Sequence, residues 1–162
     1  MRIHPGWLAT ALLVLVVLGC NLSKNSNNSN NSNGNHNANK ATPAPTRLAN
    51  ADVFVDRIYM AKDDNGKPGD KTTSFAAGDR TVHCVIELNK AKKGTQVRFI
   101  WKAVDVEGSQ NEEIKTIDYT TNSFENKVRG HLTYPKDWPT GKYRVEVYIN
   151  DSLDKTIDYT IE

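Results

Sequence analysis

Apolar and polar side chains alternate at every second residue over several segments of this chain, and this period of two constrains the fold more than any other feature. The clearest segments are 82–88, 97–104 and 143–150. Such alternation is typical of an antiparallel β-strand that buries one face. Clusters of Gly, Pro, Asn or Asp bound further apolar segments, which predicts additional strands at 53–60, 113–120, 127–134 and 155–161.

The spacing of these strands predicts an all-β domain over residues 50–162. Turn-forming residues separate the strands at 65–66, 77–79 and 139–141. No stretch of this region sustains the period of 3.6 that an amphipathic helix requires. About seven strands in a region of this length favour one antiparallel β-sandwich with a single core.

The first residues indicate export. Arg2 precedes an apolar run from Trp7 to Leu18, which is shorter than the roughly 20 residues of a membrane-spanning helix. We therefore predict a helical signal peptide over residues 1–19. The run ends in Val17-Leu18-Gly19-Cys20, which resembles the lipobox of bacterial lipoproteins. That resemblance implies cleavage before Cys20, lipidation of its sulfur and acylation by fatty acids such as palmitate; the alternative is an uncleaved anchor with an incidental cysteine.

A polar segment follows the cysteine. Residues 21–40 are almost entirely Asn and Ser, and a Pro-containing stretch follows. Because it has few apolar groups to offset the entropy of ordering, we predict that 20–49 is a disordered linker between the lipid anchor and the domain. Asn21 is not the aspartate that resembles an inner-membrane retention signal, so a cell-envelope location on the outer membrane is favoured, with the periplasmic and surface faces both open.

The order of core residues resembles the immunoglobulin-like superfold. Cys84 lies on a predicted strand, Trp101 on the next, and Tyr143 follows a turn as in a tyrosine corner. Val145 stands where the second cysteine of the family disulfide would be. The resemblance therefore implies an immunoglobulin-like domain without that disulfide, in which Cys84 is a buried free thiol near Trp101 and Val145.

Charge and motifs argue against several functions. The chain carries 21 Lys and Arg against 19 Asp and Glu, and residues 51–162 hold 17 and 19 of them, interspersed, which is not the footprint of a nucleic-acid-binding protein. The sequence has no nucleophile elbow, P-loop or zincin motif, and we expect neither an enzyme nor a cofactor. His83 and His131 alternate with apolar residues, so we expect them to face solvent or an inter-strand neighbour.

One loop has a composition that calcium prefers. Asp63, Asp64, Asn65 and Asp70 provide three carboxylates and an amide oxygen within a short stretch. The spacing differs from that of an EF-hand, because Lys67 and Pro68 interrupt it and no glutamate occupies the twelfth position. A calcium site and an ordinary solvated turn both remain open.

Aromatic residues supply the candidate binding site. Tyr134 and Trp138 flank a connection before Tyr143, where they can stack on a sugar or anchor a protein partner. The alternative is that Trp138 closes the end of the sandwich.

The hexapeptide Lys-Thr-Ile-Asp-Tyr-Thr occurs at 115–120 and again at 155–160, where its charges suit sheet edges. The sequence as a whole predicts a membrane-anchored, non-catalytic immunoglobulin-like binding or accessory module of the envelope, with an envelope protein or a glycan as partner. The alternative is a small envelope enzyme or carbohydrate-binding protein with a site at one loop end of the sandwich.

Overall fold

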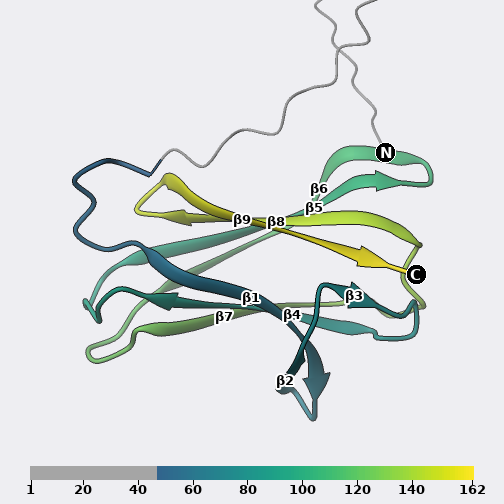
Figure 1. The fold of residues 1–162 in the computed structure, drawn as a ribbon, viewed down its shortest axis with the longest axis horizontal. Helices are drawn as coiled ribbons and strands as arrows, with labels where there is room; N and C mark the ends of the chain where they lie inside the picture. Colours follow the sequence, from purple (N-terminus) through teal and green to yellow (C-terminus); the bar gives the residue numbers. More distant parts are fainter. Residues whose placement is uncertain (1–46) are drawn as a thin grey trace, which may run out of the picture. The chain divides into compact units, whose positions relative to one another are not determined.

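The computed structural model describes residues 47–162, which form two β-sheets packed face to face (Figure 1). The predicted signal peptide, Cys20 and the linker up to residue 46 lie outside the described residues. No helix within residues 47–162 is long and apolar enough to cross a membrane. The strands are β1 (Val55–Asp64), β2 (Lys67–Lys71), β3 (Ser74–Phe75), β4 (Thr81–Leu88), β5 (Gln96–Val106), β6 (Ser109–Thr120), β7 (Lys127–Thr133), β8 (Gly141–Ile149) and β9 (Ser152–Ile161).

The first sheet has the strand order β2-β1-β4-β7 and the second has β3-β9-β8-β5-β6. All pairs are antiparallel except the short pair of β3 with β9. The all-β prediction is confirmed, and the seven predicted strands correspond to β1 and β4 to β9. The structure adds β2 and β3 to them.

Strand β1 extends further than expected because it continues into a tight hairpin with β2. Asn65 and Gly66 connect the two strands with φ values of 54° and 79°. Positive φ at both central residues is the requirement of a two-residue hairpin turn, which an Asn-Gly pair meets at low cost. The sequence 67–71 lacks alternation and contains Pro68 and Gly69, so its strand character was not visible in the pattern.

The core lies between the sheets, where the alternating apolar residues of the longer strands meet. Trp101, Phe99 and Val145 are fully buried there, together with Cys84. Gly130 of β7 packs directly over the ring of Phe99, and a Cβ atom at this position would lie 3.1 Å from Cγ of that ring. The absence of a side chain at 130 therefore lets β7 approach the opposite sheet closely.

Aromatic rings close one end of the sandwich. The Tyr143 hydroxyl donates a hydrogen bond of 2.6 Å to the carbonyl oxygen of Pro139, which is the tyrosine-corner contact that the sequence resemblance implies. The ring of Tyr143 stacks on that of Tyr159 and meets Trp138 edge to face.

The outer strands of the sheets differ in regularity. Strand β7 pairs with β4 in continuous register from Lys127 to Thr133. Strand β6 contains a register shift opposite Trp101 and Lys102. The first copy of the repeated hexapeptide lies on the β6 edge, as predicted, whereas the second lies on β9, which has β8 on one side and β3 at the end of the other.

Candidate functional site

The two predicted binding aromatics lie beside one another at the closed end. The rings of Tyr134 and Trp138 stack with centroids 5.0 Å apart. Trp138 is only 4% exposed, and its Nε1 donates a hydrogen bond to the carbonyl oxygen of Arg80. Both rings contribute to the wall of a hollow of about 340 Å³. This geometry gives Trp138 a packing role, with Tyr134 as the more accessible ring.

The carboxylates of the predicted calcium loop are part of the β1–β2 hairpin. Asp63 accepts hydrogen bonds from the backbone N–H of Gly66 and makes a side-chain contact with His83, and the amide of Asn65 donates to Asp64. Within residues 47–162, no group of three or more His, Cys, Asp or Glu side chains is placed to hold a metal ion. The calcium site therefore gains no support from the geometry.

His83 is the main departure from expectation among the candidate residues. It lies on the outer face of the four-stranded sheet, as the alternation requires, but it is only 1% exposed. Its Nε2 shares a hydrogen bond of 2.7 Å with Oδ1 of Asp63, and its ring lies 5.6 Å from that of His131 on β7. The expectation of an inter-strand neighbour holds, whereas solvent exposure of His83 is wrong because the hairpin covers this histidine.

The electrostatics of these groups follow from their surroundings. The hydrogen bond from His83 is the largest cause that lowers the pKa of the Asp63 carboxyl, and the Gly66 N–H adds to it. Burial raises the pKa of the Cys84 thiol far above its ordinary range. Cys84 is a free, buried cysteine of the core, as predicted, and a thiol with a raised pKa is a poor nucleophile.

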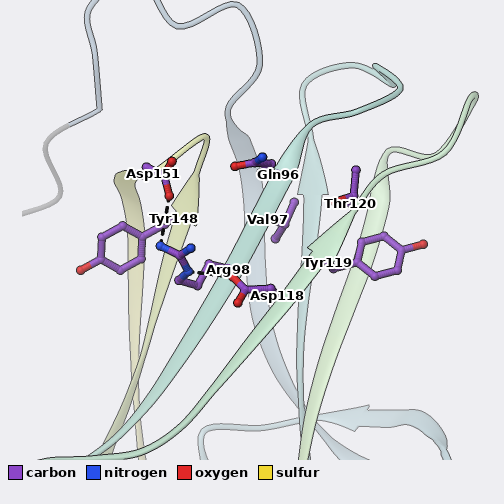
Figure 2. Close-up of a pocket in the computed structure, with 8 residues that line it drawn as sticks. All are labelled: Gln96, Val97, Arg98, Asp118, Tyr119, Thr120, Tyr148 and Asp151. Atoms are coloured by element: carbon purple, nitrogen blue, oxygen red, sulfur yellow. Dashed lines mark hydrogen bonds and ion pairs between the residues drawn. The ribbon is translucent and has the colours of Figure 1, made fainter.

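A small hollow of about 200 Å³ lies where β5 begins and where β6 and β8 end (Figure 2). Arg98 lies between two carboxylates, with Nε 2.7 Å from Asp118 and Nη1 3.1 Å from Asp151. Figure 2 shows Tyr119 pointing away from Arg98. The two carboxylates share one guanidinium, so the lining keeps a net negative charge, but each of its charged groups already has an ion-pair partner.

A larger groove of about 670 Å³ runs beside β7, and we call it the β7 groove. Its lining includes Val85, Tyr59, Pro68, Lys67, Arg129 and, from beyond the edge of the sheet, Tyr119. Val85 lies on the outer face of the four-stranded sheet and is almost completely buried. The groove is thus lined by tyrosine rings and charged side chains above the buried Val85, and its volume is that of typical ligand sites.

Cationic side chains line the β7 groove. Lys127 contacts Glu87, which also pairs with Arg57, and the ammonium of Lys71 lies over the ring of Tyr59. Within the part of the chain that the structure describes, Arg129 and Lys67 form no ion pair. The one acidic lining residue, Glu125, accepts hydrogen bonds from the Tyr119 hydroxyl and the Asn122 N–H.

The sequence contained only an indirect signal for this groove. Arg129 and Lys127 alternate with buried residues, which places them on an outer face. Their juxtaposition with Tyr59 and Val85 depends on the pairing of β1 with β4 and of β4 with β7, in which Tyr59, Val85 and Arg129 lie in one row. Strand order cannot be read from alternation.

The sequence matches no protein-family model and no curated protein. Among solved structures, the chain is similar to an immunoglobulin-like protein (PA1606) from Pseudomonas aeruginosa, with a TM-score of 0.50 and 14% identity, over 71% of this chain and 100% of that one.

Two further similarities have lower TM-scores. A Pseudomonas fluorescens alkylpurine DNA glycosylase gives 0.42 at 11% identity over 69% of this chain and 31% of that one. A Listeria innocua beta-glucosidase gives 0.41 at 14% identity over 65% of this chain and 16% of that one. Similarity at these identities concerns the fold alone. The described part of the chain is an immunoglobulin-like β-sandwich, because it has two packed sheets and is similar in fold to the Pseudomonas aeruginosa protein.

Proposed function

We propose that this protein is a lipid-anchored bacterial envelope protein whose immunoglobulin-like domain is a non-catalytic binding module. The anchor rests on the apolar run that ends in Gly19-Cys20 and on its resemblance to a lipobox. The Asn- and Ser-rich linker gives the module reach: as a flexible coil, a segment of its length spans roughly 25–30 Å.

The binding role rests on a contrast between two sets of side chains: those suited to catalysis are buried or hydrogen-bonded, and those in the β7 groove include charged groups without ion-pair partners. Cys84 and His83 are the side chains best suited to nucleophilic or acid–base catalysis. Cys84 is buried, and His83 is buried and hydrogen-bonded to Asp63. The β7 groove instead presents tyrosine rings and two cations, Arg129 and Lys67, that form no ion pair among the described residues. Such a surface suits recognition of a partner better than acid, base or nucleophilic catalysis.

The anchor is tested by growing bacteria that express the full chain with an alkyne analogue of palmitate. We expect label on the wild-type protein and none on Cys20→Ser, which should also leave the membrane fraction. Cys84→Ala is the matched control because it removes the other cysteine. Equal labelling of Cys20→Ser and wild type, or loss of label from Cys84→Ala at unchanged protein level, would refute lipidation at Cys20.

A glycan site at the closed end is a second candidate, because Tyr134 and Trp138 share the wall of one hollow. Tyr134 is the ring to test, since it is half-buried and Trp138 lies in the core. Loss of binding to cell-wall glycans in Tyr134→Ala, with an unchanged melting temperature, would support this site. Unchanged glycan binding would exclude it.

A further inference from the structure

The outer edge of β7 carries unused backbone hydrogen-bonding groups. The Leu88 N–H donates to the Asn126 carbonyl oxygen, and the Tyr134 N–H donates to that of Arg80. The β4–β7 register between these two contacts has no shift. Because hydrogen-bonded and non-hydrogen-bonded pairs alternate in an antiparallel ladder, the even-numbered residues of β7 bond to β4. The odd-numbered residues 127, 129, 131 and 133 therefore direct their N–H and C=O groups away from the sheet.

No hydrogen bond from another described residue reaches these outward groups. The same residues place their side chains on the exposed outer face, as the strict alternation of exposed and buried positions along β7 shows. A strand added at this edge would thus meet free backbone groups and, beside them, the side chains of Lys127, Arg129 and His131.

The other strands at the ends of the two sheets, β2, β3 and β6, are poorer templates for strand addition. Strand β3 has two residues, and β2 contains Pro68 and a register shift against β1. Strand β6 is long but is interrupted by its own register shift and by Asn111 at a φ of 53°. Such irregularities protect edges from pairing. Strand β7 is regular over its whole length and keeps its edge open.

The charge of β7 selects the kind of strand that can pair with it. Lys and Arg on an edge commonly serve to prevent pairing with another copy of the same protein. They have the opposite effect on an acidic strand, whose carboxylates would lie next to Arg129, which forms no ion pair among the described residues, and near Lys127, which also contacts Glu87. Lys67, a further cation without an ion pair among the described residues, lies in the groove beside β7.

We propose that β7 and its groove bind an extended acidic segment of a partner protein by β-strand addition. This rests on the proposed binding function of the module and names its partner chemistry. Backbone hydrogen bonds along β7 would supply affinity, and alternate side chains facing Arg129 and the groove would supply specificity. A second copy of this chain would bring its own Arg129 close to this Arg129, and a glycan has no row of alternating N–H and C=O groups to pair with β7.

The probe is a synthetic peptide in which Glu alternates with Thr, compared with the same peptide carrying Lys for Glu. We expect the full-length protein in detergent to bind the acidic peptide and not the basic one, with weaker binding at high salt. Arg129→Glu should weaken binding about tenfold or more. Lys93→Glu makes the same change in net charge on an exposed loop and should leave binding unchanged.

Two methylated peptides separate strand addition from simple charge attraction. Methylation of alternate backbone amides in one register removes the donors that face β7, and methylation in the other register spares them. We expect one methylated peptide to lose binding and the other to keep it. Binding should also slow hydrogen exchange at the amides of 129, 131 and 133.

Several outcomes would overturn the proposal. The first is that the acidic peptide does not bind. The second is that Arg129→Glu and Lys93→Glu change its affinity equally at equal melting temperatures, and the third is that both methylated peptides bind equally well. A dimer in solution that Arg129→Glu dissociates would assign the edge to self-association instead. Acylation at Cys20 is measured independently, so failure of the anchor and failure of strand addition give different results.

Discussion

Nε2 of His83 lies 2.7 Å from Oδ1 of Asp63, and this contact fastens the β1–β2 hairpin to the outer face of the four-stranded sheet. Asp63 lies near the end of β1, just before the hairpin turn, and His83 belongs to β4. Covering His83 in this way fixes the position of Lys67 and Pro68, which form one side of the β7 groove. The contact therefore links the stability of the hairpin to the shape of the groove.

The first prediction concerns pH. The hydrogen bond from His83, aided by the Gly66 N–H, lowers the pKa of Asp63 from its ordinary value of 3.8. The unfolded chain then binds this proton more readily than the folded chain, so the stabilisation from Asp63 is complete above pH 3.8 and is lost as pH falls through the lowered folded-state value. In urea unfolding at a series of pH values, the stability advantage of wild type over Asp63→Asn should shrink in that window.

Asp64→Asn is the control for this experiment, because the Asp64 side chain is exposed and bonds only to its neighbour Asn65. We expect its pH profile to follow that of wild type. If Asp63→Asn also followed wild type through the acidic window, the Asp63–His83 contact would contribute nothing to stability.

The second prediction concerns the close approach of β7 to the core. A Cβ atom at Gly130 would lie 3.1 Å from the Phe99 ring, which is fully buried and has little room to move. Overpacking of this kind costs about 1–3 kcal/mol, so Gly130→Ala should lower the melting temperature by several degrees. Gly78→Ala is the control, since nothing lies within 4 Å of the added atom. Equal melting temperatures for the two variants would contradict the packing described.

The third prediction concerns Cys84. Burial both shields the thiol and raises its pKa, so the reactive thiolate is scarce in the folded protein. A small thiol reagent should label the native protein at a rate limited by unfolding and label it rapidly in urea. Labelling of lipidated Cys84→Ala should remain absent in urea as well, because Cys20 is blocked. Fast labelling of Cys84 without urea would place this residue at the surface.

The fourth prediction concerns Trp138. Its ring packs between Tyr134 and Tyr143, and its Nε1 bonds to the backbone of Arg80. Truncation of a buried aromatic residue costs about 3–5 kcal/mol, so Trp138→Ala should be strongly destabilised in chemical unfolding. Tyr148→Ala, in which the truncated ring is half-buried on an outer face, should lose less. A near-wild-type stability of Trp138→Ala would instead favour a role at the surface.

The longer strands were predictable because their apolar residues face a single core. Val97, Phe99 and Trp101 alternate with polar residues, and all three are buried between the sheets. Strand β3 has only two residues, too few to show a period, and β2 is a charged segment with Pro68 and Gly69. Segment 67–71 becomes strand β2 because the Asn65-Gly66 turn brings it back alongside β1.

The candidate site was less predictable because it depends on contacts between distant segments. Alternation placed His83 on an outer face, but its burial comes from a hairpin that folds over that face. Arg129, Val85 and Tyr59 share a row only through the order in which three strands pair. Tyr143 was recognisable because its partner, Pro139, lies four residues away in the same turn.

The parallel pairing of β3 with the end of β9 bears on how the domain forms during synthesis. Phe75 lies opposite Ile161, and the Ala77 N–H donates to the Glu162 carbonyl oxygen. Ile161 is also buried in the core and pairs with β8. Residues of β3 are therefore held by residues of β9 that are made 86 positions later. The pairing of β3 with β9 cannot form until residue 162 has been synthesised, so the five-stranded sheet of the nascent domain stays incomplete until that point.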